Sequence, residues 1–222
     1  MKMKNSKLKD FREKYGHAWI LGYIFIYLPW FAYLEDKVTA RYHVMHSELD
    51  DMIPFNEYFI IPYLLWFLYV AAAVLYFFFT NKEDYYRLCI FLFTGMTFCL
   101  LICTLIPNGV NFRPSVDPEK NLCSWLVAFI HRADTSTNVF PSIHVYNSIG
   151  VHIAVHKSRE LRKYPWVRVG SFVLAAAICL STVFLKQHSV LDVAGAMLLC
   201  TAIYPLAYAG SAEHERKTVV IR

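Results

Sequence analysis

Long apolar stretches separated by short polar segments run through almost the whole chain. A helix needs about 20 mostly apolar residues to cross the hydrocarbon core of a bilayer. Six stretches come close to this length: residues 18–34, 58–80, 88–106, 140–156, 167–185 and 189–209. The pattern therefore predicts an all-α, polytopic membrane protein with six transmembrane helices.

Two parts of this pattern are less regular. The fourth stretch carries His144, Asn147, His152 and His156, and polar residues inside a span are candidates for function. For His152 and His156 the two interpretations are a polar stripe between helices and the proton path of a transporter. Residues 121–130 are apolar but cover only about half a span. They predict a helix that lies along the membrane surface.

The composition excludes a soluble globular protein. Hydrophobic residues make up 57% of the 222 residues and charged residues only 18%, whereas soluble domains average roughly 45–50% and about 25%. The net charge of +5 raises the alternative of a nucleic-acid partner. The basic residues are instead spread over every segment of one side, so we expect a bilayer and no nucleic acid as the partner.

The Lys and Arg residues also predict the orientation, because cytoplasmic loops carry an excess of them. With six crossings, 16 of the 22 Lys and Arg residues lie on the same side as both termini. The other side holds only Lys37, Arg41, Arg113, Lys120, Arg132 and Lys186. We expect a basic cytoplasmic segment over residues 1–16, a membrane domain over residues 17–210 and a cytoplasmic tail over residues 211–222.

The two long outer segments cover residues 35–57 and 107–139 and contain no Asn-x-Ser/Thr. This is compatible with a multi-pass protein of a bacterial cell membrane; the outer side is then periplasmic or extracellular, and a lumenal side is the alternative. In the first segment, His43 and His46 lie near Glu48, Asp50 and Asp51. We expect a solvated acidic loop there, with a metal site as the alternative.

Two features on the outer side suit a phosphate group. Arg113 follows the third predicted helix, and its guanidinium is a planar fork of donors that matches phosphate oxygens. Pro141-Ser142-Ile143-His144 begins the fourth predicted helix, and free N–H groups at a helix start bind anions. The alternatives are an arginine among lipid headgroups and a structural histidine at the interface.

The third feature is His188 followed by Asp192 at the start of the sixth predicted helix. Residues four apart lie on one helix face. A carboxylate that accepts from one imidazole nitrogen leaves the other nitrogen free as a nucleophile or base. The alternative is a structural pair that caps the helix.

Together these residues form a set that can transfer a phosphoryl group. His188 attacks phosphorus, Asp192 orients His188, and His144 protonates the departing oxygen. Arg113 and Ser142 bind the phosphate oxygens. This chemistry predicts no metal and no cofactor.

The same residues resemble the type 2 phosphatidic acid phosphatase superfamily of membrane lipid phosphatases. Its motifs are KxxxxxxRP, PSGH and SRxxxxxHxxxD. The first motif corresponds to the stretch from Ile106 to Arg113-Pro114. The second corresponds to Pro141-Ser142-Ile143-His144. The third corresponds to the stretch from Ser181-Thr182 through His188 to Asp192. The resemblance implies that residues 17–210 form a six-helix catalytic domain that hydrolyses a lipid phosphate monoester or diphosphate through a phosphohistidine.

The chain differs from these motifs at two positions where the family has positively charged side chains. Ile106 and Thr182 stand where the family has lysine and arginine. Lys186, one helical turn after Thr182, is a candidate replacement in the phosphate site, and Lys120 is another. The departures resemble the phosphotransferase branch with the inositol phosphorylceramide and sphingomyelin synthases. A headgroup transferase and a non-catalytic lipid transporter or lipid-binding protein are therefore the alternative functions.

Overall fold

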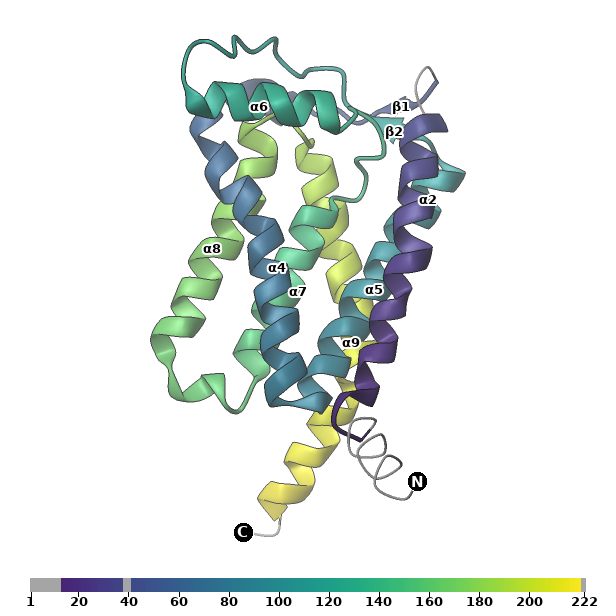
Figure 1. The fold of residues 1–222 in the computed structure, drawn as a ribbon, viewed down its shortest axis with the longest axis vertical. Helices are drawn as coiled ribbons and strands as arrows, with labels where there is room; N and C mark the ends of the chain where they lie inside the picture. Colours follow the sequence, from purple (N-terminus) through teal and green to yellow (C-terminus); the bar gives the residue numbers. More distant parts are fainter. Residues whose placement is uncertain (1–12, 38–40, 221–222) are drawn as a thin grey trace, which may run out of the picture.

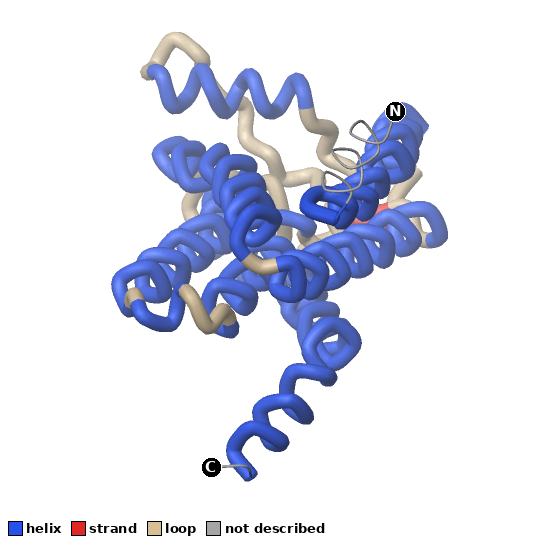
Figure 2. The backbone as a smooth tube through the Cα atoms, turned by 60° about the horizontal axis from the view of Figure 1, so that its bottom comes forward, coloured by secondary structure: helices blue, strands red, loops and turns tan. Residues whose placement is uncertain are grey.

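The computed structural model describes residues 13–37 and 41–220, with side chains through residue 209, and is mainly helical (Figure 1). Its helices are η1 (Gly16–Tyr23), α2 (Ile24–Lys37), α3 (Glu48–Met52), η2 (Glu57–Phe59), α4 (Ile60–Thr80), α5 (Lys82–Leu105), α6 (Leu122–Ala133), α7 (Ile143–Lys157), η3 (Leu161–Lys163), α8 (Pro165–Phe184) and α9 (Val190–Val220). Strands β1 (His43–Val44) and β2 (Asn108–Gly109) form a short parallel pair, the red element in Figure 2. The all-α fold class predicted from the sequence is confirmed.

Among the described residues, five helical segments are long and apolar enough to cross a membrane: Glu13–Lys37, Glu57–Thr80, Lys82–Leu105, Pro165–Phe184 and Val190–Ala209. They correspond to five of the six predicted stretches. The remaining stretch, residues 140–156, forms α7, whose 15 residues extend for only about 22 Å at 1.5 Å per residue. This helix begins late because Ser142 caps it, accepting from the backbone N–H of Val145.

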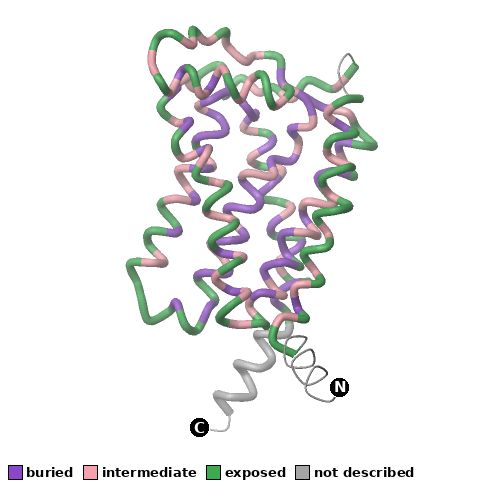
Figure 3. The backbone as a smooth tube through the Cα atoms, in the orientation of Figure 1, coloured by how far each residue is buried: buried purple, intermediate pink, exposed green. Residues whose placement is uncertain are grey.

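Helix α7 lies inside the bundle and contacts α4, α5, α8 and α9. Tyr146, Asn147 and Ser148 are buried there, so these three polar side chains are shielded by other helices. The outer helix faces instead expose large apolar side chains such as those of Trp19 and Phe25. Figure 3 shows exposed positions along the outer helices and buried positions toward the interior. Soluble monomers rarely expose contiguous apolar patches of this kind, and the distribution agrees with helices that face lipid.

Close packing fixes α7 against α5 in the middle of the bundle. A Cβ atom at Gly95 would lie 2.0 Å from the ring of Tyr146, so a side chain there would overlap the ring. That ring stacks on Phe91 with centroids 4.9 Å apart, and its hydroxyl donates to the Phe91 carbonyl at 2.9 Å. The glycine lets the two helices approach closely enough for these contacts.

Three connecting segments meet at the end of the bundle crossed by α6, which we call the α6 end (Figure 1). Strand β2 pairs with β1 on one side, and Gly109 bridges to Thr137 on the other. A Cβ atom at Gly109 would lie 2.6 Å from the Ser136 carbonyl oxygen, so only glycine fits. These contacts bring the two long loops together over the bundle.

The first described residues and the end of α9 lie at the opposite end from α6 (Figure 1). Residues 1–12 of the predicted basic segment 1–16, and residues 221–222 of the predicted tail 211–222, lie outside the described residues. Helix α9 continues to Val220, so the rest of that tail extends the last helix.

Candidate active site

His188 and Asp192 form a buried pair where α9 begins. The Nδ1 atom of His188 lies 3.2 Å from Oδ2 of Asp192, and the two side chains are 9% and 0% exposed. The same carboxylate oxygen accepts from the backbone N–H of Ser189 at 2.9 Å. Because an ionised carboxylate only accepts hydrogen bonds, we assign the imidazole proton to Nδ1, which leaves Nε2 with a lone pair.

His144 faces this pair from the first turn of α7. Its ring centroid lies 5.7 Å from that of His188 at 61°. On its other sides His144 packs against Tyr63 and Trp66 of α4, with centroid distances of 4.5 Å and 4.4 Å. The two histidines come from helices far apart in the sequence, and the aromatic rings hold His144 in place.

Ser142 joins the starts of α7 and α9. Its backbone N–H donates to the Asp192 carbonyl at 3.2 Å, and its hydroxyl accepts from the Val145 N–H at 3.4 Å. The residue is completely buried. These contacts position His144 relative to the His188–Asp192 pair, so the structure gives Ser142 a capping role.

Arg113 is held by Asp134, which follows the end of α6. One terminal nitrogen donates to the Asp134 carbonyl at 2.7 Å, and the other lies 3.8 Å from its carboxylate. Burial raises the pKa of Asp134, Arg113 and His188 lower it, and Glu35 raises it. The net effect is a raised pKa for Asp134, with burial as the largest cause. Arg113 lies at the same end of the bundle as His188, because the ring of its neighbour Phe112 lies 5.8 Å from the ammonium of Lys186.

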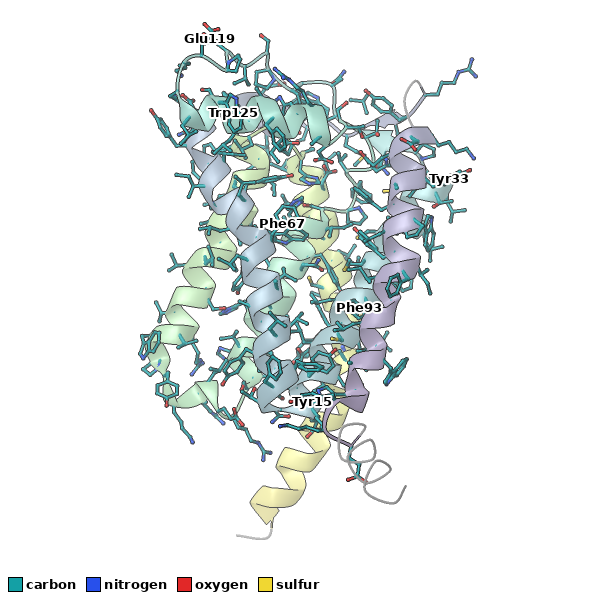
Figure 4. The ribbon with its side chains drawn as sticks, in the orientation of Figure 1. Tyr15, Tyr33, Phe67, Phe93, Glu119 and Trp125 are labelled. Carbon is teal, nitrogen blue, oxygen red and sulfur yellow. The ribbon has the colours of Figure 1, made fainter. Side chains whose placement is uncertain are left out.

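His131, near the end of α6, is a neighbour that sequence reasoning missed. Burial, followed by the positive charge of Arg113, lowers the pKa of His131 to about 4. The imidazole is therefore neutral at pH 7. The sequence contains no signal for His131, because the apolar pattern of residues 121–130 predicts only a helix along the membrane surface. In Figure 4 this helix, marked by Trp125, lies across the end of the bundle.

Several buried polar atoms at the α6 end have no partner among the described residues. They include Nε of Arg113, Nε2 of His131, Oδ1 of Asp192 and both amide atoms of Gln187, the residue before His188. Most buried polar atoms in proteins are hydrogen-bonded. A concentration of unsatisfied donors and acceptors beside a histidine pair is typical of a site that binds a polar ligand or water.

Asp50 organises the start of α9 and was also missed. Its carboxylate accepts from the Ser189 hydroxyl at 2.6 Å and from the Val190 N–H at 2.8 Å. Asp50 is only 3% exposed, so the expectation of a fully solvated acidic loop is wrong at this position. The signal was present as Ser47-x-x-Asp50, the spacing of a capping box, which the structure forms.

Lys186 supports the same loop. Its ammonium donates to the backbone carbonyls of Asp50 and Ile53, and it lies 5.8 Å from the ring centroid of Phe112. The side chain that was predicted to bind phosphate thus contacts α3. It also lies near Phe112, the residue that precedes Arg113. Lys120, the other candidate, pairs with Glu57 at 2.5 Å.

The positions that depart from the family motifs supply no cation. Thr182 is fully buried and its hydroxyl donates to the Cys179 carbonyl at 2.8 Å. Ile106 is half exposed at the end of α5. No group of three or more potential metal ligands from His, Cys, Asp and Glu occurs among the described residues.

Comparison with protein-family models, curated proteins and solved structures finds no match to this chain. The arrangement itself is what defines the site. An oriented imidazole with a free nitrogen faces a second imidazole, and a guanidinium lies at the same end of the bundle. Such a set can donate a nucleophile, transfer a proton and neutralise an anion.

Proposed function

We propose that the chain is a membrane lipid phosphatase that cleaves a phosphate monoester or diphosphate through a phosphohistidine at His188. The observation that carries this proposal is the buried His188–Asp192 pair at 3.2 Å, facing His144 at a ring-centroid distance of 5.7 Å. The motif resemblance assigns the same three residues. Neither line of support depends on a metal or a cofactor.

In the first half-reaction, Nε2 of His188 attacks phosphorus while the bond from phosphorus to the ester oxygen breaks. His144 enters this step as an imidazolium, whose charge the bound phosphate anion favours, and gives its proton to the departing oxygen. The lipid therefore leaves as an alcohol, or as a monophosphate when the substrate is a diphosphate. Asp192 accepts from Nδ1 of His188 and stabilises the positive charge that develops on the ring.

In the second half-reaction, water attacks the phosphorus and gives its proton to His144. The bond from phosphorus to nitrogen breaks, inorganic phosphate leaves, and both histidines return to their starting states. Hydrolysis and headgroup transfer share the first half-reaction. They differ in whether water or a lipid hydroxyl reaches the phosphohistidine.

Arg113 is the cation we assign to the phosphate oxygens. Its Nε is unpaired and its contact with the Asp134 carboxylate is long, at 3.8 Å, so a phosphate can displace that carboxylate. We further propose that Lys186 and Ser142 act by positioning. Lys186 holds the loop whose Asp50 supports Ser189 and Val190, and Ser142 caps α7.

We also propose six membrane crossings, with α7 as the short fourth crossing and both termini cytoplasmic in a bacterial cell membrane. The excess of Lys and Arg on the terminal side supports this orientation. An enclosed helix tolerates a short hydrophobic length because other helices surround it. The α6 end then faces outward, where a lipid phosphate enters sideways from the leaflet.

The second candidate function is a phosphodiester headgroup transferase of the sphingomyelin synthase type. It is favoured by Thr182 and Ile143, which replace the arginine and glycine of the phosphatase motifs. Thr182 is buried against its own helix, so the site has fewer cations than a phosphatase of the resembled family.

The test uses the full chain in detergent with EDTA and a panel of lipid phosphates, diphosphates and phosphodiesters. Mass spectrometry reads lipid products, and phosphate release is measured in parallel. His188→Ala is the active-site variant, and His156→Ala, at the opposite end of the bundle, is the matched control. Phosphate release that only His188→Ala loses supports the phosphatase; a headgroup on a new lipid supports the transferase. No product from any substrate favours a non-catalytic lipid-binding protein.

A further inference from the structure

A second polar cluster lies at the end of the bundle opposite the candidate active site. His152 and His156 lie in the second half of α7, with His156 one residue before its end, and Arg168 lies near the start of α8. His156 is twelve residues after His144, about 18 Å along the helix. The cluster therefore shares α7 with the candidate active site and is separate from it.

The contacts within the cluster leave one hydrogen-bond donor of Arg168 without an acceptor in the described part of the chain. One terminal nitrogen of Arg168 lies 2.9 Å from Nδ1 and 3.1 Å from Nε2 of His156. Its Nε is buried and has no partner among the described residues. His152 is anchored separately through Ser171, whose hydroxyl lies 3.2 Å from Nδ1 of His152 and 2.6 Å from the hydroxyl of Tyr69.

The Lys and Arg side chains that act on the two histidines of the cluster give it a positive environment. Arg168 acts on both imidazoles, and Lys157 and Arg162 act on His156 as well. None of the ion pairs among the described residues involves Arg168. A guanidinium that is partly withdrawn from water and lacks a carboxylate creates a strong preference for an anion.

The cluster lines an open groove with an apolar wall. The groove has a volume of about 350 Å³ and is lined by His152, His156, Pro165, Arg168, Val169 and Phe172. Val169 and Phe172 are 62% and 59% exposed. They continue along α8 away from Arg168, toward the middle of the predicted bilayer. A ligand that fits both parts has an anionic head and an apolar tail.

We propose that this groove binds an anionic phospholipid of the leaflet opposite the candidate active site. The phosphate lies against Arg168 and His156, and an acyl chain lies over Val169 and Phe172. The groove is a binding site and takes no part in the chemistry at His188. The proposal therefore stands or falls independently of the phosphatase activity.

Arg162 provides a matched comparison on the same side of the bundle. It belongs to η3, the short helix before α8, and is exposed. It does not line the groove. A general attraction of basic residues to anionic lipid would involve Arg162 as much as Arg168, whereas a built site depends on Arg168.

The test titrates the full chain in detergent with phosphatidylglycerol, phosphatidylcholine or inorganic phosphate, and native mass spectrometry measures the bound fraction. We expect wild type and Arg162→Gln to prefer phosphatidylglycerol over phosphatidylcholine. Arg168→Gln should weaken binding of phosphatidylglycerol roughly tenfold or more, because it loses a charge-assisted hydrogen-bond donor. Equal loss in Arg162→Gln, no loss in Arg168→Gln, or equal affinity for phosphatidylcholine overturns the proposal.

Two further measurements on the wild-type protein test the proposal if Arg168→Gln does not fold. Inorganic phosphate should compete weakly, and an affinity equal to that of phosphatidylglycerol would assign the site to a soluble phosphate instead. A photoreactive phosphatidylglycerol should label wild-type peptides that contain α8 residues near Val169 and Phe172. Labelling confined to other helices contradicts the assignment.

Discussion

The two ends of α7 place histidines in opposite electrostatic settings. At the α6 end, His144 faces His188, whose Nδ1 is paired with the buried carboxylate of Asp192. At the other end, His156 lies against the guanidinium of Arg168. A carboxylate fixes the tautomer and supports a developing positive charge, whereas a guanidinium opposes it. The partner, more than the histidine itself, distinguishes a candidate nucleophile from a candidate anion-binding residue.

The largest effect that sharpens this comparison is expected from Asp192→Asn. The amide no longer supports the imidazolium and favours the wrong tautomer of His188, and a comparable change in a serine protease costs about 10⁴-fold in kcat. We expect a loss of about 10³- to 10⁴-fold in the rate of lipid dephosphorylation with the helical fold retained. Initial rates together with circular dichroism measure both.

Asp51→Asn is the matched control. Asp51 also pairs with a histidine, His46, at 3.0 Å, but both side chains are solvent-exposed. Its rate should stay within about twofold of wild type, since exposed ion pairs contribute little. A similar rate for Asp192→Asn and Asp51→Asn would remove the distinction between the buried pair and an ordinary surface pair.

A smaller effect is expected from Arg113→Lys. Lysine keeps the charge but loses the planar fork, so we expect KM for the lipid phosphate to rise about tenfold, with a smaller change in kcat. Steady-state kinetics over a range of substrate concentrations in mixed micelles separates the two parameters. Arg132→Lys changes an exposed residue at the same end of the bundle and should leave both unchanged; equal behaviour of the two variants would make Arg113 a surface anchor.

The smallest effect concerns the pH dependence of stability. The pKa of His131 in the fold is about 4, below its ordinary value near 6.5. The unfolded chain therefore binds a proton first, and the stability that neutral His131 contributes is lost as the pH falls from about 6.5 toward 4. Full linkage between pH 7 and pH 5 corresponds to about 2 kcal/mol. Because the ring is only partly buried and solvent screens it, His131→Gln should reduce the loss by about 1 kcal/mol.

Thermal unfolding in detergent at several pH values measures this contribution. His46→Gln serves as the control because the hydrogen bond that His46 donates to the Asp51 carboxylate raises the pKa of His46. Its contribution has the opposite sign, present at low pH and lost as the pH rises. The same pH slope in wild type and His131→Gln would contradict a partly buried, neutral imidazole whose pKa burial and the charge of Arg113 lower.

Much of the fold could be predicted from the sequence, because helices that face lipid must be apolar over about 20 residues. Five predicted stretches form helices of that kind. The fourth was harder to assign because α7 is enclosed by other helices. Its polar positions, such as Asn147, are therefore no evidence against a helix, and its length is set by the cap at Ser142.

The candidate site could be predicted where its residues share a helix or a motif, as His188 and Asp192 do. The supporting contacts could not, because they depend on how loops fold over the bundle. Asp50 reaches Ser189 across 139 positions in the sequence, and Asp134 meets Arg113 across 21. Lys186 follows Thr182 by four residues, but α8 ends at Phe184, so helical spacing does not place the two side chains together. The backbone of Lys186 has a positive φ of 58°, and its ammonium donates to the Asp50 carbonyl of α3.

The most direct test of the central claim is to trap the intermediate. The full chain is mixed with a lipid substrate carrying a labelled phosphoryl group, quenched in alkali, digested and mapped. The account predicts an acid-labile, base-stable label on the peptide containing His188, retained in His156→Ala and absent from His188→Ala. A label that persists in His188→Ala, or active enzyme that never carries a label, would contradict the assignment of His188 as the nucleophile.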